Sequence, residues 1–257
     1  MRARIGMLPV TVISLKRSAD RRENFRRHNA HLDFEFFDAV DGSALSLAEL
    51  NAGGLFEPGL PYSVGAYGVA LSHLTQWDRI IESGQARTIA EDDAIFRLDF
   101  PSQQTRLLQA LPPDWDMILW GWNFDAALAL DAMPGMTPMA LLCDQQQLRG
   151  ALDQFQAITT PPQLFRLRSA FGLPCYSMSP AGARKFKAGC FPMRNAAVFF
   201  PVLGSDVRNF GIDIATNRLY PDLNVLFSLP PLVATGNDHS RSTVQNDIYF
   251  PGSPRPT

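Results

Sequence analysis

The stretch TIAEDDAIF, residues 88–96, sets three adjacent carboxylates directly after a short apolar run of strand-forming residues. Like charges at this spacing repel one another, so we expect a positive group among Glu91, Asp92 and Asp93. Ligands of open α/β sheets bind beyond the carboxyl ends of strands, and divalent cations such as Mg²⁺ or Mn²⁺ prefer carboxylate oxygens. The stretch therefore leaves two interpretations open: a cation that bridges the acidic side chains and a diphosphate, or a solvated loop.

Outward from this stretch, strand-like and helix-like patterns alternate along the first half of the chain. The apolar, β-branched run 9–15 predicts a buried strand, and the apolar stripe over 66–83 predicts a helix that ends at Gly84. Other segments follow the same two patterns: strands at 34–40, 86–90 and 116–122, and helices at 16–29, 46–50 and 101–111. This order predicts an α/β fold with a mostly parallel central sheet flanked by helices.

The second half of the chain is patterned less regularly. Residues 122–168 show no firm strand, although 141–155 have a helix-like composition. Three later elements are expected: a strand at 171–179, a helix at 179–189 with Ser179 as its N-cap, and a strand at 223–229. No internal repeat or clear boundary divides the sequence, so we expect a single domain.

Composition narrows the class of protein. The 257 residues are 46% hydrophobic and 19% charged, which is enough apolar material for a core. A formal net charge of −2 argues against a surface that coats nucleic acid. The three cysteines have no CxxC spacing and are expected to be reduced thiols of a cytoplasmic protein. No apolar run is long enough to span a bilayer, so we expect a soluble protein.

Four blocks of the sequence are similar, in order and spacing, to those of one known family. They are VISLKRSADRRENF (Val12–Phe25), GAYGVALSHLTQWDRII (Gly65–Ile81), TIAEDDAIF (Thr88–Phe96) and YSMSPAGARKF (Tyr176–Phe186). A looser fifth similarity begins at GID (Gly211–Asp213) and continues through LPPLVAT to HSRST. These blocks resemble glycosyltransferase family 25, which contains bacterial lipooligosaccharide galactosyltransferases and the collagen galactosyltransferases.

The chain also departs from the family pattern. Ser14 stands where the opening strand usually carries Asn, and Lys16 where an acidic residue is common. The Ser-His helix often begins with Gly-Glu and contains a Cys, whereas this chain has Ala66 and Val69 at those places.

The resemblance implies a GT-A fold, a nucleotide-binding α/β sandwich with an acidic metal motif, over a single domain of residues 1–257. Residues 1–121 would then form the nucleotide-sugar-binding half, and residues 122–257 the acceptor side and the C-terminal tail. The resemblance further implies a UDP-sugar as donor substrate and Mn²⁺ or Mg²⁺ as cofactor.

The family's site residues carry over onto the matched blocks. By that resemblance, Asp93 coordinates the metal directly, and Glu91 and Asp92 contact the metal, its waters or the donor ribose. His239 is a candidate for a further metal ligand. The other residues expected at the donor are Val12, Ile13 and Ser14 near the nucleobase, and Arg17, Arg21 and Arg22 near the diphosphate. For Ser72 and His73, donor contact and a structural hydrogen bond are both open.

Known activities of this family form β-linkages from an α-linked UDP-sugar, which implies inversion by a single displacement. Such a reaction needs one carboxylate that removes a proton from the acceptor hydroxyl, and Asp213 is the first candidate, with Asp206 second.

The resulting hypothesis is a metal-dependent inverting glycosyltransferase that moves a sugar, expected to be galactose from UDP-galactose, onto a lipopolysaccharide-type glycan. It would act in the cytoplasm, at most in peripheral contact with the inner membrane through a glycolipid acceptor, and without nucleic acid. Two alternatives stay open: a catalytically reduced glycan- or nucleotide-binding domain of the same fold, and a metal-dependent phosphohydrolase.

Overall fold

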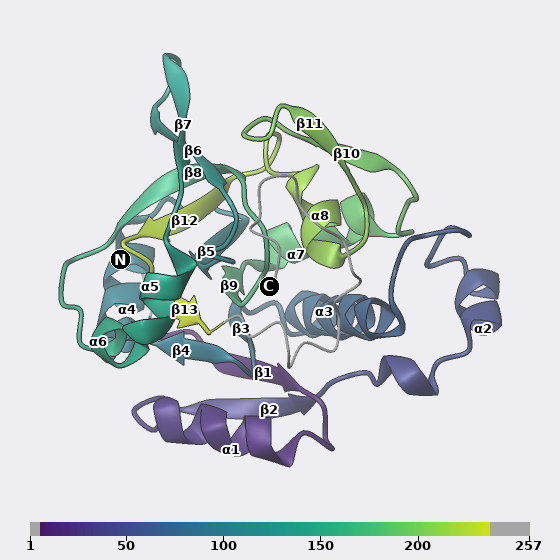
Figure 1. Cartoon of the computed structure of the whole chain (residues 1–257), viewed down its shortest axis with the longest axis horizontal. Helices are drawn as coiled ribbons and strands as arrows, with labels where there is room; N and C mark the ends of the chain where they lie inside the picture. The colour runs from purple at the N-terminus through teal and green to yellow at the C-terminus, as the bar shows by residue number, and fades with distance from the viewer. Residues whose placement is uncertain (1–5, 237–257) are drawn as a thin grey trace.

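A nine-stranded sheet runs through the centre of the molecule (Figure 1), in a computed structural model that describes residues 6–236. Its strand order is β2-β1-β3-β9-β5-β12-β8-β6-β7, and two small sheets, β10-β11 and β13-β4, accompany it. The strands are β1 (Val10–Ser14), β2 (Phe34–Asp38), β3 (Arg87–Glu91), β4 (Ala94–Phe96), β5 (Met117–Gly121), β6 (Leu128–Met133), β7 (Thr137–Leu141), β8 (Gln163–Ser169), β9 (Cys175–Met178), β10 (Ala197–Phe200), β11 (Ser205–Arg208), β12 (Val225–Leu229) and β13 (Val233–Thr235). The helices are α1 (Ala19–His28), the 3₁₀ turn η1 (Gly42–Ala44), α2 (Leu47–Ala52), α3 (Val64–Ser83), α4 (Phe100–Ala110), α5 (Gln145–Gly150), α6 (Leu152–Gln156), α7 (Pro180–Cys190) and α8 (Ile212–Asn217).

The α/β class is confirmed, but the expectation of a mostly parallel sheet is wrong, because the sheet is mixed. Three strand pairs are parallel, β1 with β2, β1 with β3, and β5 with β12. The other five pairs of the nine-stranded sheet are antiparallel. A short turn joins β6 to β7, and a connection of that length can only reverse the chain, whereas a parallel pair needs a long crossover. Strand β9 also enters the sheet antiparallel, between β3 and β5.

Every strand predicted from the apolar runs is present, and the long helix follows its predicted stripe. Helix α3 begins at Val64, where the Ser63 side chain accepts a hydrogen bond from the Ala66 N–H. It ends at Gly84, whose φ of 66° is a left-handed conformation that glycine adopts without strain. Helix α7 is capped as predicted, because the Ser179 hydroxyl oxygen accepts a hydrogen bond from the Gly182 N–H at 2.9 Å.

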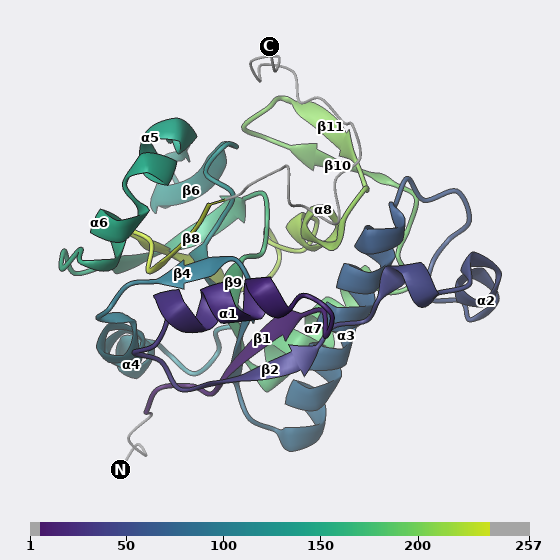
Figure 2. The same cartoon turned by 60° about the horizontal axis from the view of Figure 1, so that its bottom comes forward.

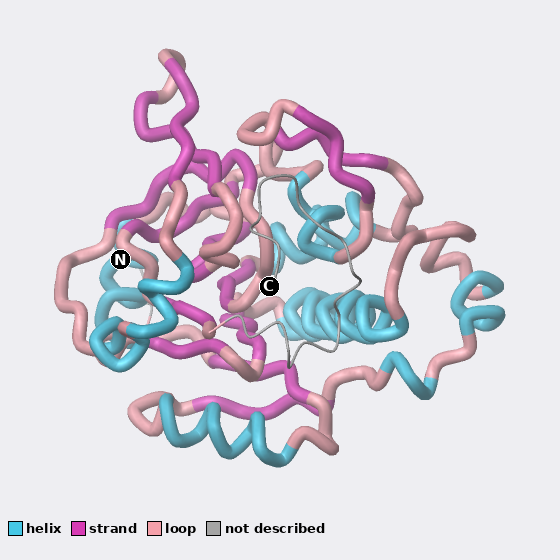
Figure 3. Tube along the Cα trace, in the orientation of Figure 1, coloured by secondary structure: helices cyan, strands magenta, loops and turns pink. Residues whose placement is uncertain are grey.

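The stretch 122–168 differs from its prediction, since it supplies β6, β7 and β8. Strand β7 is the outermost strand of the sheet and most of its residues are exposed, so it lacks the alternation of buried and exposed side chains that identifies a strand. Figure 3 shows the β6-β7 hairpin extending beyond the rest of the molecule. The helix expected over 141–155 is two short helices, α5 and α6.

Helices cover both faces of the sheet. On one face, α3 and α7 bury Trp77 and Phe186 against the sheet. On the other face, α1 and α4 bury Phe25 and Phe100, and α1 lies nearest the viewer in Figure 2. The carboxyl ends of β1 and β3 lie side by side, because the two strands are parallel neighbours.

Candidate functional site

The acidic triplet lies at the carboxyl end of β3, beside the carboxyl end of β1. The two strands are parallel neighbours in which Ile13 stands opposite Glu91. Strand β3 ends at Glu91, and Asp92 and Asp93 form the turn into β4. The three carboxylates have different neighbours: Glu91 lies near His73, Asp92 binds Ser14 and Arg21, and Asp93 lies beside Arg21.

Asp92 is buried, and its carboxylate binds a positive group from α1. One oxygen accepts a hydrogen bond from the Ser14 hydroxyl at 2.6 Å, and the other accepts one from the Arg21 Nε–H at 2.7 Å. The Arg21 Nη2 atom forms an ion pair with the same carboxylate and lies 4.0 Å from Asp93 Oδ2. Arg21 is therefore one positive group that relieves the repulsion within the triplet, and Asp92 serves to hold it.

Asp93 retains an unused oxygen. Its Oδ1 atom is enclosed without a hydrogen-bond partner in the described part of the chain, although 37% of the side chain is exposed. The pKa of Asp93 is raised to about 6, chiefly by burial and further by the charges of Glu91 and Asp92, while Arg21 and a hydrogen bond with Thr235 act in the opposite direction. A carboxylate oxygen left without a partner beside other carboxylates suits a divalent cation as a ligand.

The triplet does not form a closed metal cage. Within residues 6–236, no group of three or more His, Cys, Asp or Glu side chains converges as a metal site would require. A cation at Asp93 would thus take one or two carboxylates from this region and fill its other positions with water or phosphate oxygens, as Mg²⁺ commonly does. These carboxylates therefore fit a site in which the protein and a diphosphate bind the cation together. His239, the predicted further ligand, lies outside the described residues.

Glu91 faces His73 of α3. The His73 ring is 1% exposed, and its Nε2 atom lies 3.9 Å from Glu91 Oε1. Its Nδ1 atom lies 2.8 Å from the Tyr176 hydroxyl, which also accepts a hydrogen bond from the Trp77 Nε1–H at 2.9 Å. Reasoning from the sequence missed the parts played by Tyr176 and Thr235, although both lie within stretches that resemble the family.

Ser72 forms hydrogen bonds within the protein. Its hydroxyl donates to the Gly68 carbonyl at 2.7 Å and accepts from the Val40 N–H at 2.9 Å, and the residue is fully buried. Gly68 lies so close to the loop that a Cβ there would stand 2.5 Å from the Val40 carbonyl oxygen. These contacts fix α3 against the chain that leaves β2.

The remaining predicted donor residues lie where the sheet ends, but the protein already binds most of their polar groups. Arg17 forms an ion pair with Asp41. Arg22 donates to Asp38 Oδ1 at 2.6 Å and to the Ser14 carbonyl at 2.7 Å. Val12 and Ile13, both buried, pair with β2 and β3 on their two sides, which leaves the strand end at Ser14 as the part of β1 nearest to a ligand.

The two candidate bases lie in different surroundings. Asp213, near the start of α8, accepts a hydrogen bond from the Gly172 N–H at 3.0 Å. Burial raises the pKa of Asp213, and the nearby charge of Glu91 raises it further, whereas backbone N–H groups of Gly172 and Ile214 lower it. Asp206 lies on the exposed strand β11, opposite Phe199. The charge of Glu91, in the triplet, thus acts on Asp213.

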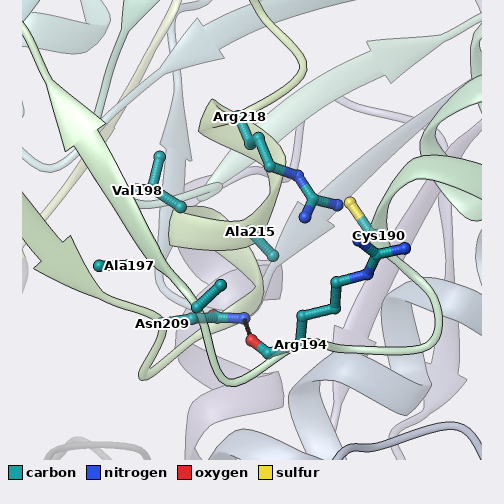
Figure 4. Close-up of a pocket in the computed structure, with 8 residues that line it drawn as sticks. Cys190, Arg194, Ala197, Val198, Asn209, Ala215 and Arg218 are labelled. Carbon is teal, nitrogen blue, oxygen red and sulfur yellow. Dashed lines mark hydrogen bonds between the residues drawn. The ribbon is translucent and has the colours of Figure 1, made fainter.

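A small cavity lies between the end of α7, helix α8 and strand β10 (Figure 4). Arg194 and Arg218 line it together with Cys190 and Ala215. The Arg194 carbonyl accepts a hydrogen bond from the Asn209 side chain at 2.9 Å. Burial raises the pKa of Cys190 to about 12, so its sulfur is an unreactive thiol. None of the predicted site residues lines this cavity.

Comparison with known proteins connects this geometry to one family. The model of glycosyltransferase family 25, described as an LPS biosynthesis protein, matches residues 7–188. Asp206, Asp213 and His239 lie beyond that match. In the described residues, no helix has the length and apolar character that crossing a membrane requires.

Three relatives illustrate the range of the similarity. A proposed glycosyltransferase of Acanthamoeba polyphaga mimivirus is 36% identical over 122 residues, which is 44% of this chain and 37% of the relative. Procollagen galactosyltransferase 1 of Danio rerio is 32% identical over 132 residues, 46% of this chain and 22% of the relative. The human inactive glycosyltransferase 25 family member 3 is 32% identical over 151 residues, 52% of this chain and 25% of the relative. The chain thus spans less than two fifths of the length of these curated relatives.

Proposed function

The chain belongs to glycosyltransferase family 25, and from this membership we propose that it transfers a sugar from a nucleotide-sugar donor to a glycan acceptor. The observation that carries the proposal is the family match over residues 7–188 together with the acidic triplet at the carboxyl ends of β1 and β3. A GT-A-type fold, which the family implies, places its nucleotide sugar at such an edge of the sheet.

On the donor side, Asp93 and Glu91 are the proposed ligands of Mn²⁺ or Mg²⁺. A cation bound there would neutralise the diphosphate and the charge that builds on the leaving group. The enclosed and unpartnered Oδ1 atom of Asp93 supports this assignment. Arg21 and Ser14 hold Asp92 in place, so we assign Asp92 to the ordering of the triplet and of the donor ribose beside it.

On the acceptor side, Asp213 is the proposed general base. The acceptor oxygen forms a bond to the anomeric carbon, the bond from that carbon to the diphosphate breaks, and the acceptor proton passes to Asp213. A raised pKa makes a carboxylate a better proton acceptor near neutral pH, and burial raises the pKa of Asp213. This single displacement inverts the anomeric configuration.

The proposals for the donor sugar, the acceptor and the place of action rest on the resemblance to the family. We propose UDP-galactose as the donor and a lipopolysaccharide-type glycan as the acceptor, because relatives are named as procollagen galactosyltransferases and the family is described by LPS biosynthesis. The proposed place of action is the cytoplasmic face of the inner membrane, reached through a lipid-linked acceptor.

A second candidate function is binding without turnover. The human relative named as inactive matches this chain over 151 residues at 32% identity, as well as the galactosyltransferases do. Similarity alone therefore does not separate an active transferase from a binding domain, and the experiment must measure binding and turnover separately.

A panel of UDP-sugars tested with and without Mn²⁺ provides that separation. We expect one donor to raise the melting temperature in a metal-dependent manner, and the same donor to label a lipooligosaccharide acceptor, detected by mass spectrometry. Metal-dependent stabilisation without transfer to any glycan would favour the binding domain. No stabilisation by any nucleotide sugar would contradict both the transferase and a nucleotide-binding domain.

A further inference from the structure

Three buried side chains form a hydrogen-bonded chain that ends at the acidic triplet. His73 and Trp77 are one turn apart on α3, and Tyr176 lies on β9. The Tyr176 hydroxyl lies 2.9 Å from Trp77 Nε1 and 2.8 Å from His73 Nδ1. Trp77 and Tyr176 are fully buried and His73 is 1% exposed, so water does not compete for these bonds.

The direction of each hydrogen bond follows from what the groups can donate. An indole N–H is only a donor, so the Tyr176 oxygen accepts from Trp77. Burial raises the pKa of Tyr176 well above its ordinary value, so the hydroxyl keeps its proton and directs it to His73 Nδ1. Because Nδ1 accepts, a neutral His73 ring carries its proton on Nε2.

The Nε2–H group that results has no partner. His73 Nε2 is buried without a hydrogen bond in the described residues, and the nearest carboxylate oxygen is Glu91 Oε1 at 3.9 Å. A buried donor without a partner costs about 1–3 kcal/mol. An apolar side chain of similar shape would fill this place without that cost, so packing does not account for the histidine.

We propose that Trp77 and Tyr176 lock His73 as an Nε2–H donor that binds and positions Glu91 when a nucleotide sugar and its cation enter the site. A movement of about 1 Å brings the two atoms from 3.9 Å to hydrogen-bond distance. One Glu91 oxygen is then held by His73, and the other is presented to the ligand. The use made of Glu91 rests on the proposed function; the locked tautomer does not.

The tautomer is measurable without any ligand. The chain has four histidines, so the His73 ring can be assigned in ¹⁵N-histidine-labelled protein by the signal lost in His73→Gln. Long-range ¹H–¹⁵N correlation at pH 8 should show a single His73 tautomer, protonated at Nε2. In Tyr176→Phe this signal should become an average of both tautomers. A wild-type ring protonated at Nδ1, or already averaged, would overturn the proposal.

A matched variant tests whether the effect of Tyr176→Phe is specific to the hydrogen bond with His73. The alternative is that loss of any buried tyrosine hydroxyl has the same effect. Tyr62 is also a buried tyrosine, and its hydroxyl donates to Asn209 Oδ1 at 3.0 Å, away from His73. Tyr62→Phe should leave the His73 tautomer unchanged. If the His73 signals change as much in Tyr62→Phe as in Tyr176→Phe, the hydrogen bond from Tyr176 has no specific effect on the His73 tautomer.

Ligand binding tests the positioning of Glu91. Adding UDP and the diamagnetic ion Mg²⁺ to the wild type should shift the His73 Nε2–H resonance. By calorimetry, Tyr176→Phe should weaken UDP binding in Mn²⁺ by about three- to tenfold, without a matching change in Mn²⁺-free binding. Equal UDP affinity in Tyr176→Phe and wild type would overturn the positioning role. If the wild type binds no nucleotide, the proposed function is wrong, and so is the positioning of Glu91 for a ligand. The NMR measurement of the His73 tautomer would still test whether Tyr176 and Trp77 fix that tautomer.

Discussion

Arginine side chains in two regions of the molecule differ in their ion-pair partners. Near the acidic triplet, on the proposed donor side, carboxylates of the protein bind the side chains of Arg17, Arg21 and Arg22. In the half proposed to face the acceptor, Arg194 and Arg218 line a cavity beside α8, and the structure of residues 6–236 pairs neither with a carboxylate. The arginines of the proposed donor side are therefore held by ion pairs within the protein, whereas these two arginines of the proposed acceptor side are exposed. Arginines in a sequence do not reveal this difference.

The largest expected effect falls on the acceptor side and separates chemistry from binding. Asp213→Asn should leave UDP-sugar binding intact and lower the rate of transfer by about a hundredfold or more, because a general base contributes about 10²–10⁴. The measurement is single-turnover transfer beside donor affinity by calorimetry. Full turnover in Asp213→Asn, with loss in Asp206→Asn, would move the base to β11.

The next effect concerns the unpartnered carboxylate on the donor side. Asp93→Ala should remove the metal-dependent part of UDP binding, at least about tenfold or 1.4 kcal/mol, while the protein remains folded because a crowded charge has been removed. Calorimetric titration of UDP with and without Mn²⁺ measures this. Retention of the full metal-dependent affinity would show that Asp93 is not a ligand.

A matched pair of substitutions tests the comparison of the two regions directly. Arg21→Gln leaves the buried Asp92 carboxylate without its cation and should lower the free energy of unfolding by about 1–3 kcal/mol. Arg218→Gln, in which an exposed side chain loses one contact to the Gly189 carbonyl, should change it by no more than about 0.5 kcal/mol. Urea unfolding measures both. Equal costs would mean that the donor side is no more organised than the acceptor side.

The smallest effect is a pH dependence. The pKa of Asp93 is raised from 3.8 to about 6 in the folded protein, so folding favours its protonated form. Its contribution to stability is complete below about pH 4 and is lost as the pH rises through about 6. Because the side chain is partly exposed, we expect about 1 kcal/mol or less. Asp93→Asn should remove this part of the pH dependence of unfolding; an unchanged profile would contradict it.

Most of the architecture around the site was predictable, because buried strands and capped helices leave strong local patterns. Strands β1 and β3 and helix α3 bury apolar residues, and the spacing of these residues is visible in the sequence. Strand β7 was not predictable, since an exposed edge strand lacks alternation. The mixture of parallel and antiparallel strand pairs was not predicted, because strand direction depends on connections between distant segments.

The location of the acidic triplet at a strand end was predictable, but the partners of its side chains were not. The triplet lies at the strand end, as expected. That Asp92 would bind Arg21 and Ser14, and that Asp93 would keep one oxygen free of hydrogen bonds, depends on which way each side chain turns. His73 was identified, but Tyr176 lies 103 positions away, and no local pattern connects them.

The place of β9 between β3 and β5 has a consequence for synthesis on the ribosome. When residue 121 has emerged, β1, β2 and β3 can pair, but β5 has neither of its neighbours, β9 and β12. The strand that bridges this gap ends at Met178, so the nascent chain must expose the bare edges of β3 and β5 until that residue leaves the exit tunnel. Unpaired edges of this kind invite pairing with other chains, which makes this interval the one in which a chaperone has the most to protect.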